Sequence, residues 1–290
     1  MNYRELIERL TPLHGIREAQ AIVRMVAEER FGLSLTDLLL GKGTDLSAND
    51  RKEWEEIAHR LVKGEPVQYV LSYANFCGHR FRVTPDVLIP RPETEELVQR
   101  AKDYLLSSAI YYHSSTNVLD LCTGSGCIAI SLASACPSAH VLGVDISPAA
   151  LSVARFNAEA LGAENVRFEM ADILCPDYRY YLMQEGRKFD LLIANPPYVR
   201  LSEAAEMSST VLEHEPHLAL FVPDDDPLRF YKALAAIGRQ VLVKGGFVQV
   251  ELNRSLAEET LRLFVHYGFV HTEIHADSFG NDRMLNAVNP

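Results

Sequence analysis

The sequence predicts an α/β protein: a doubly wound, mostly parallel seven-stranded sheet, with a small helical N-terminal domain and a β-hairpin linker before it. From about residue 116, apolar runs of strand length alternate with helical patterns, which is typical of a parallel sheet. Before residue 65, apolar residues recur at helical spacing. Gly64-Glu65-Pro66 interrupts that spacing. We therefore expect three parts, at residues 1–65, 66–84 and 85–290.

The helical N-terminal part shows two amphipathic patterns. Leu6, Ile7 and Leu10 open the first, and Ser47 to Lys63 form the second. The second has one apolar face, made of Trp54, Ile57, Ala58, Leu61 and Val62. No glycine loop and no acid–base cluster occurs in this part. Its role stays open between a packing module and a module for partner recognition.

The linker alternates like two short strands. Val67 to Val70 and His79 to Val83 are the predicted strands, joined around Asn75 to Gly78 as a hairpin.

A helix is predicted to begin at Pro92. Proline suits the first helical turn, and the acids that follow suit the positive end of the helix. Arg91, Thr94 and Glu95 would then lie at a helix start beside a cleft. As structure alone, the pattern is an ordinary helix start.

The remaining elements complete the predicted sheet. Strands are expected at 117–121, 140–145, 166–170, 189–194 and 246–251, with two closing strands near Val270 and Leu285. Helices are expected at 128–136, 148–161, 226–240 and 255–267. Ligands of such sheets bind beyond the carboxyl ends of the strands. The residues at those ends, which we expect to meet in one crevice, are Asp120, Gly124, Asp145, Asp172 and Asn195.

The fourth strand stops at Asn195-Pro196-Pro197-Tyr198. Two prolines lack N–H donors and have a fixed φ, so the chain after the strand is stiff and extended. Asn195 and the carbonyl of Pro196 can then act as paired acceptors, with the flat ring of Tyr198 alongside. This arrangement suits a planar NH2 group, although a strand followed by a proline-rich turn has the same pattern.

The glycine loop indicates a nucleoside cofactor. Gly124 to Ala129 matches the dinucleotide pattern G-x-G-x-x-A, and Asp145, about 20 residues on, can bind both ribose hydroxyls. Asp120 would repel a pyrophosphate but suits the positive amino and sulfonium groups of S-adenosylmethionine. A nicotinamide enzyme, moreover, does not need the acceptor pair at Asn195. We predict S-adenosylmethionine, with a strand-end cap as the alternative role of Asp120.

These motifs resemble those of known enzymes. Asp120 to Gly126 looks like the first motif of class I methyltransferases, which have a Rossmann-like fold, and Asn195 to Tyr198 resembles the NPPY motif of those that methylate planar NH2 nitrogens. The likeness narrows to the HemK/PrmC family and covers nearly the whole chain; its further matches are Leu88 to Glu95, Glu215-Pro216 with Ala219-Leu220, and Gly280 to Arg283. Cys122 departs from the pattern, because many relatives have glycine there. We expect its side chain to turn away from the ligand.

The resemblance implies an enzyme of translation termination. Members methylate N5 of the glutamine in the Gly-Gly-Gln motif of class 1 peptide-chain release factors and leave S-adenosylhomocysteine as the product. The implied catalytic residues are Asn195, Pro196, Pro197 and Tyr198. The implied cofactor-binding residues are Asp120, Cys122, Thr123, Gly124, Ser125, Gly126, Asp145, Ile146, Asp172, Ile173 and Asn195. The implied substrate-binding residues are the same four catalytic ones with Arg91, Thr94 and Glu95.

Composition and charge limit the partners. The 290 residues are 48% hydrophobic and 23% charged, as in ordinary globular proteins. No apolar run reaches membrane-span length and no signal peptide is evident, so we expect a cytoplasmic protein without a membrane partner. A net charge of −11 opposes direct bulk nucleic-acid binding. Five cysteines without a C-x-x-C pair predict free thiols and no metal site. We expect a monomer.

Three other functions stay open. An N6-adenine or other nucleic-acid methyltransferase would share the acceptor pair, and a nicotinamide-dependent oxidoreductase would share the glycine loop. A noncatalytic release-factor binder would share the cofactor fold. The segment from Val199 to Pro223 is long for a loop and is expected to form either a lid or a solvated surface; its acids are Glu203, Glu206, Glu213 and Glu215.

Overall fold

The computed structural model describes residues 2–39, 46–106 and 116–290. The chain divides into two compact units, one holding residues 1–73 with 207–214 and the other holding residues 74–206 with 215–290. Within the described residues, no helix is both long enough and apolar enough to cross a membrane.

The first unit is helical, as predicted for the N-terminal part. Its helices are α1 (Tyr3–Phe31), α2 (Leu35–Leu39), α3 (Ala48–Val62), α4 (Val67–Leu71) and α10 (Ser209–His214). Asn2 and Glu5 form a capping box at the start of α1, and Ser47 caps α3. Gly15 has a non-helical φ of 75°, which kinks α1. The predicted apolar stripes of α1 and α3 share one core.

The strand predicted over Val67 to Val70 is wrong, because these residues begin helix α4. Pro66 is the N-cap of α4, and Val67, Val70 and Leu71 are all buried. Their i, i+3 and i+4 spacing puts them on one helical stripe. An apolar run this short fits either a strand or a helical turn, so periodicity alone did not separate the two.

The hairpin itself is present, but its first strand comes later. It joins β1 (Tyr73–Phe76) to β2 (His79–Arg82). Cys77 and Gly78 make the turn with φ values of 47° and 76°.

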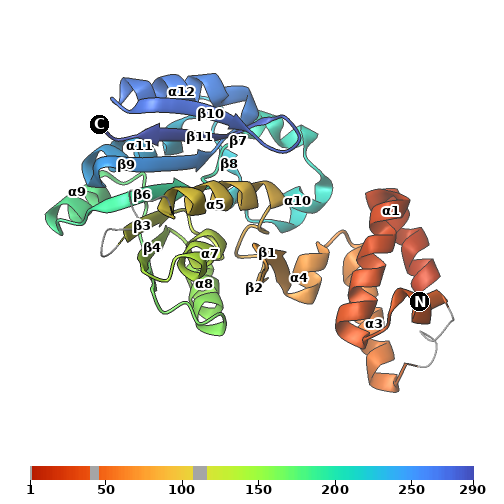
Figure 1. Ribbon diagram of the computed structural model, residues 1–290. Coiled ribbons are helices and arrows are strands. Elements are labelled where there is room, and N and C mark those ends of the chain that lie inside the picture. Colours follow the sequence, from red (N-terminus) through yellow and green to blue (C-terminus); the bar gives the residue numbers. More distant parts are fainter. Residues whose placement is uncertain (1, 40–45, 107–115) are drawn as a thin grey trace. The chain divides into compact units, whose positions relative to one another are not determined.

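The second unit is built on a seven-stranded sheet in the order β10-β11-β9-β6-β3-β4-β5 (Figure 1). The strands are β3 (Thr116–Leu121), β4 (Ala139–Asp145), β5 (Val166–Met170), β6 (Phe189–Ala194), β9 (Leu242–Glu251), β10 (Val270–Ala276) and β11 (Asp282–Val288). Strand β11 is antiparallel to both of its neighbours, and the pairs among β9, β6, β3, β4 and β5 are parallel. The predicted fold class is confirmed.

Helices cover both faces of this sheet. Helices α5 (Pro92–Leu105), α7 (Cys127–Ala135) and α8 (Pro148–Ala160) pack on one face, and α9 (Pro176–Gln184), α11 (Arg229–Val241) and α12 (Ala257–His266) pack on the other. Strand β3 shows the alternation that two covered faces require. Val118 packs in the core under α5 and α7, and Leu119 and Leu121 pack in the core under α9, α11 and α12. Helix α9 had not been predicted.

The segment from Val199 to Pro223 is not a long loop. It contains β7 (Val199–Arg200), the 3-10 turn η2 (Leu201–Glu206), helix α10, the 3-10 turn η3 (His217–Ala219) and β8 (Phe221–Val222). Strands β7 and β8 pair in parallel, so the two ends of the segment are held together.

Candidate active site

A cavity of about 320 Å³ lies beyond the carboxyl ends of β3, β4, β5 and β6, which is the position that a doubly wound sheet favours for a ligand. Most of the predicted site residues line it. Those are Arg91, Thr94, Cys122, Thr123, Gly124, Ser125, Asp145, Ile146, Asp172, Ile173, Asn195 and Pro197. The residues predicted to bind the methyl donor and the residues predicted to bind the substrate therefore line one continuous cavity. Asp120, Gly126, Glu95, Pro196 and Tyr198 are not among the described residues that line it.

The two loop glycines have different surroundings. Both have a positive φ, 54° at Gly124 and 79° at Gly126. A Cβ atom built on Gly124 would meet no atom within 4 Å, so the loop is open toward the cavity there. A Cβ atom on Gly126 would lie 3.1 Å from both Ala154 Cβ and Phe168 Cζ. Gly126 therefore allows close packing of the loop against its neighbours, while Gly124 leaves room for a ligand.

Asp145 organises the loop from the end of β4. Its Oδ2 accepts a 2.9 Å hydrogen bond from Gly124 N, and its Oδ1 accepts one of 2.9 Å from Ser147 N. Burial raises the pKa of Asp145, and these backbone hydrogen bonds work in the opposite direction. Each carboxylate oxygen keeps a second lone pair, which is available to a ribose hydroxyl.

The backbone of the loop is poorly suited to a pyrophosphate. Gly124 N–H is bound to Asp145, Thr123 N–H donates to Val144 O, and Gly126 N–H donates to Thr123 O. A dinucleotide site presents such N–H groups to phosphate oxygens. Here these three already have partners within the chain, which disfavours the nicotinamide alternative.

Asp120 lies behind the loop and does not face the cavity directly. It is fully buried, and its Oδ2 accepts hydrogen bonds from Thr123 Oγ1 at 2.5 Å and from Ala129 N at 3.2 Å. Gly126 is the N-cap of α7 and has no side chain, so Asp120 supplies the acceptor that the first turn of α7 needs. These contacts match the alternative of a structural cap. Its Oδ1 is buried and has no hydrogen-bond partner among the described residues, and the predicted role of Asp120 in binding the cofactor stays a prediction.

The charge of the cavity wall does fit a cationic donor. Asp86, Asp145 and Asp172 line the cavity with carboxylates. The guanidinium of Arg91, which also lines it, is paired with Glu215 at 2.6 Å. Apolar side chains of Ile146 and Ile173 complete this end of the wall. A sulfonium and an ammonium group would be attracted here, whereas a pyrophosphate would be repelled.

Asn195 is held through a chain of side-chain hydrogen bonds. Its Nδ2 lies 3.2 Å from Thr94 Oγ1, and Thr94 Oγ1 donates to Glu251 Oε2 at 2.7 Å. The hydroxyl of Tyr198 donates to the other oxygen, Glu251 Oε1, at 2.8 Å. Thr94 and Glu251 are each 2% exposed. The Oδ1 atom of Asn195 is at the opposite end of the amide from the Thr94 contact.

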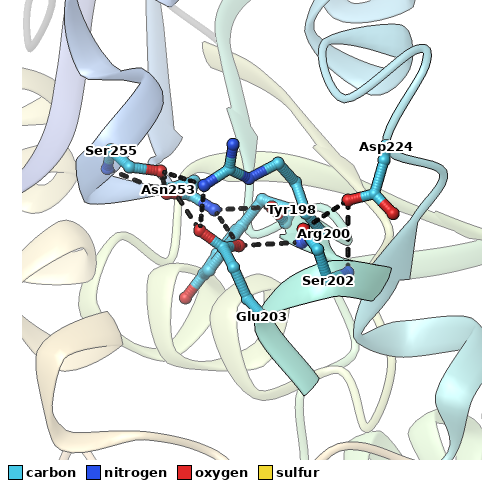
Figure 2. A network of polar contacts seen from close by, with 7 residues as sticks. All are labelled: Tyr198, Arg200, Ser202, Glu203, Asp224, Asn253 and Ser255. Atoms are coloured by element: carbon cyan, nitrogen blue, oxygen red, sulfur yellow. Dashed lines mark hydrogen bonds and ion pairs between the residues drawn. The ribbon is translucent and has the colours of Figure 1, made fainter. Parts of the chain in front are cut away.

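The backbone just after the Asn-Pro-Pro-Tyr motif is also fixed (Figure 2). Asn253 Nδ2 donates to the main-chain oxygen of Tyr198 at 2.9 Å and to Glu203 Oε2 at 2.8 Å. Glu203 also pairs with Arg200 at 2.8 Å, and its Oε1 lies 3.2 Å from Ser255 Oγ. Glu203, one of the acids considered for a lid, therefore ties the motif to the end of β9.

Two further acids near the cavity have structural partners. The Glu215 side chain is 1% exposed and binds both Arg91 and the N–H of Ile89, the latter at 3.2 Å. It thereby joins the two segments that carry the Ile-Pro-Arg-Pro and Glu-Pro sequences. Glu95 accepts a 3.0 Å hydrogen bond from Cys77 N. Glu95 therefore supports the hairpin turn, and its expected role in substrate binding stays a prediction.

Sequence reasoning missed Glu251 and Phe230. Phe230 lines the cavity from α11. Glu251 could have been found, because it is the last residue of β9, an acid at a strand end like Asp145. Cys122 has a φ of 65°, and its side chain packs against the core that α11 and α12 cover.

Comparisons with known proteins agree with this geometry. Residues 112–248 match the family described as Methyltransferase domain, and residues 3–71 match the PrmC N-terminal domain. The chain is 41% identical to the release factor glutamine methyltransferase of Bacteroides thetaiotaomicron, over 97% of this chain and 96% of that one. It is 37% identical to the enzyme of the same name from Flavobacterium psychrophilum, over 98% and 97%. Its fold is similar to that of the methyltransferase domain of METTL16 lacking its N-terminus, with a TM-score of 0.51 at 15% identity, over 71% of this chain and 86% of that one.

Proposed function

The chain belongs to the release factor glutamine methyltransferases, S-adenosylmethionine-dependent enzymes, and on this premise we propose which atom it methylates. The acceptor is N5 of the glutamine in the Gly-Gly-Gln motif of class 1 peptide-chain release factors. The observation that carries this proposal is the position of Asn195 on the same cavity wall as Gly124 and Asp145. An acceptor for a planar NH2 group thereby shares one space with the residues suited to the donor.

The reaction needs a positioned amide nitrogen more than it needs a base. An amide lone pair is delocalised into the carbonyl, and a side-chain base that works near neutral pH is poorly matched to removing an amide proton first. Asn195 Oδ1 and the Pro196 carbonyl would each accept one N–H of the glutamine. The nitrogen lone pair then faces along the transfer direction, and positioning supplies most of the rate. The proton leaves after the nitrogen has been alkylated.

The chain's own residues hold the donor in place. S-adenosylmethionine supplies an electrophilic methyl group on a positively charged sulfur. Asp145 would bind the ribose hydroxyls, and Ile146 and Ile173 would pack against the adenine ring. The carboxylate of Asp172 adds to the negative potential that suits the donor's cationic end. The proposed product is S-adenosylhomocysteine.

The same acceptors would select glutamine over glutamate. A glutamate carboxylate brings no N–H donor and would place its oxygens against Asn195 Oδ1. A site that is built to bind an NH2 group rejects an analogue without it by factors of the order of 10⁴–10⁵. Tyr198 would pack on the plane of the bound amide.

We expect the protein to act in the cytosol, and we assign a different role to each predicted part of the chain. We assign partner recognition to the helical residues 1–65, connection to residues 66–84, which hold helix α4 and the hairpin of β1 and β2, and methyl transfer to residues 85–290, acting as a monomer.

The test is to incubate the enzyme with labelled S-adenosylmethionine and a release factor and to locate the methyl group by mass spectrometry. We expect it on the Gly-Gly-Gln glutamine. A release factor with that glutamine changed to glutamate is the control and should stay unlabelled. Label on another residue, or on added DNA or RNA in place of the release factor, would contradict the proposal.

A further inference from the structure

We propose that Glu251 is a positioning residue that determines which end of the Asn195 side-chain amide faces the substrate. The inference rests on the proposed function, because it concerns how Asn195 presents an acceptor to the glutamine. Glu251 acts through Thr94 and is not placed in contact with the substrate. Three steps lead from the contacts of Glu251 to this role.

The first step is the direction of the hydrogen bonds at Glu251. The hydroxyls of Thr94 and Tyr198 both donate to Glu251, at 2.7 Å and 2.8 Å, which is the arrangement that a carboxylate with acceptors and no donors requires. Burial opposes the charge of Glu251 and raises its pKa, while the two hydroxyl donors and the positive charge of Arg283 favour the ionised form. The two hydroxyls together with Arg283 thus stabilise the acceptor-only state.

The second step is the direction of the hydrogen bond between Thr94 and Asn195. A threonine hydroxyl has one proton, and Thr94 gives that proton to Glu251. Toward Asn195, Thr94 Oγ1 can then act only as an acceptor, so the amide end that lies 3.2 Å away must be the NH2 group. Asn195 Oδ1 is consequently directed away from Thr94 and is available to accept from the glutamine.

The third step is the burial of this relay, meaning the chain Glu251, Thr94 and Asn195. Thr94 and Glu251 are each 2% exposed, so bulk water does not offer the hydroxyl a competing partner. The orientation of the amide is therefore set by a carboxylate two hydrogen bonds away from Asn195 Nδ2.

Replacing the carboxylate by an amide should remove this control. In Glu251→Gln, the new NH2 group can donate to Thr94 Oγ1, and the Thr94 proton is then free to donate to Asn195 Oδ1. The Asn195 amide can turn over and present its NH2 group to the NH2 group of the glutamine. Two donors then face each other, and the acceptor for one N–H of the substrate is lost.

The experiment compares Glu251→Gln, Thr94→Val and Thr94→Ser with Glu259→Gln, a change of the same chemistry on the exposed face of α12. Two quantities are measured: kcat on a release factor, and the ratio of the dissociation constants of the Gly-Gly-Glu and Gly-Gly-Gln release factors. Glu251→Gln and Thr94→Val should lower kcat roughly 10- to 100-fold, less than the direct loss of a polar contact at the reacting centre. The ratio should fall about tenfold in both, because the Asn195 amide is reversed in Glu251→Gln and is no longer held in one orientation in Thr94→Val. Thr94→Ser keeps the hydroxyl and should restore both quantities relative to Thr94→Val, and Glu259→Gln should leave both at their wild-type values.

A merely structural role for Glu251 would give a different pattern. It would lower kcat or thermal stability but leave the discrimination between glutamine and glutamate unchanged, and that result would overturn the inference. Neutron diffraction on crystals of the wild-type protein and of Glu251→Gln gives a reading that does not depend on the substrate. We expect deuterium on the atom of Asn195 that faces Thr94 in the wild-type protein, and reversal in the variant. If the wild-type enzyme fails to methylate a release factor, the proposed function fails, and the diffraction result still decides the orientation of Asn195.

Discussion

Thr94 and Glu251 are 157 positions apart in the chain, and a 2.7 Å hydrogen bond joins them inside the protein. Thr94 belongs to the first turn of α5, and Glu251 ends β9. Through Thr94 the bond also reaches Asn195, at the end of β6. Three separate elements thus fix the amide that we assign to substrate binding, and this explains how one asparagine can be held rigidly on the wall of the cavity.

Loss of the Asn195 side chain should slow catalysis while leaving the donor bound. We expect Asn195→Ala to lower kcat by roughly 10²–10³, the usual effect of removing one preorganised polar contact at a reacting centre. Steady-state kinetics gives kcat, and calorimetry should show that S-adenosylmethionine still binds. Asn75→Ala, at an exposed position of β1, is the control. Near-normal turnover of Asn195→Ala with the donor bound normally would refute the assignment.

Asp145 should matter mainly for binding the donor. In Asp145→Ala the ribose hydroxyls lose charge-assisted hydrogen bonds worth roughly 1.5–3 kcal/mol each. Gly124 N and Ser147 N also lose their acceptor. The dissociation constant of S-adenosylmethionine, measured by calorimetry, should therefore rise at least about tenfold. Asp177→Ala, at an exposed position of α9, should leave it unchanged. An Asp145→Ala protein that binds the donor as tightly as the wild type would count against this role.

Asp120 should make the stability of the protein depend on pH. Burial raises the pKa of Asp120 to about 7, while an unfolded aspartate titrates near 4. Between these values the folded protein keeps a proton that the unfolded chain has lost. The stabilisation due to Asp120 is therefore complete below about pH 4 and is lost as the pH rises to about 7.

Asp120→Asn removes this titration, because asparagine stays neutral. Its unfolding free energy relative to the wild type should increase by on the order of 1 kcal/mol from pH 6 to pH 8. Urea unfolding of both proteins at the two pH values measures the difference. An unchanged difference would show that Asp120 has an ordinary pKa.

Cys122 should be a strained position. Its φ of 65° costs a residue with a Cβ atom roughly 1–2 kcal/mol, which glycine avoids. Cys122→Gly and Cys122→Ala both remove the sulfur and its packing, but the alanine keeps the strain. Although glycine gains flexibility when unfolded, we expect the glycine variant to be the more stable of the two by roughly 0.5–1 kcal/mol in urea unfolding. Equal stabilities, or a more stable alanine variant, would mean that the backbone strain is relieved elsewhere.

Local signals in the sequence identified most of the sheet and of the cavity. Pro92 begins α5, and Ser147 caps α8 by accepting a 3.1 Å hydrogen bond from Ala150 N, as the proline and serine positions indicate. Asp145 and Asn195 follow strands whose parallel arrangement is fixed by the alternation with helices, so their meeting at one edge could be predicted.

The hydrogen-bond partners of the buried acids could not be predicted from the local sequence pattern. Asp120 shares a sheet face with Val118, two residues before it, and that face is covered by α7. Its acceptor role there arises because Gly126 leaves the N–H of Ala129 uncapped, and this is visible only once the helix is packed on the strand. Glu251 similarly needs Thr94, which the chain brings near only by tertiary folding. The short helix α4 was predicted as a strand, because an apolar run of one helical turn fits both the helical and the strand periodicity.

The most direct test of the central claim is a crystal structure of the enzyme with S-adenosylhomocysteine and a Gly-Gly-Gln release factor. The account predicts that the glutamine N5 lies within hydrogen-bond distance of both Asn195 Oδ1 and the Pro196 carbonyl, with its free face toward the sulfur of the product. A complex in which Asn195 and Pro196 point away from the glutamine, or in which another residue holds its NH2 group, would contradict the claim.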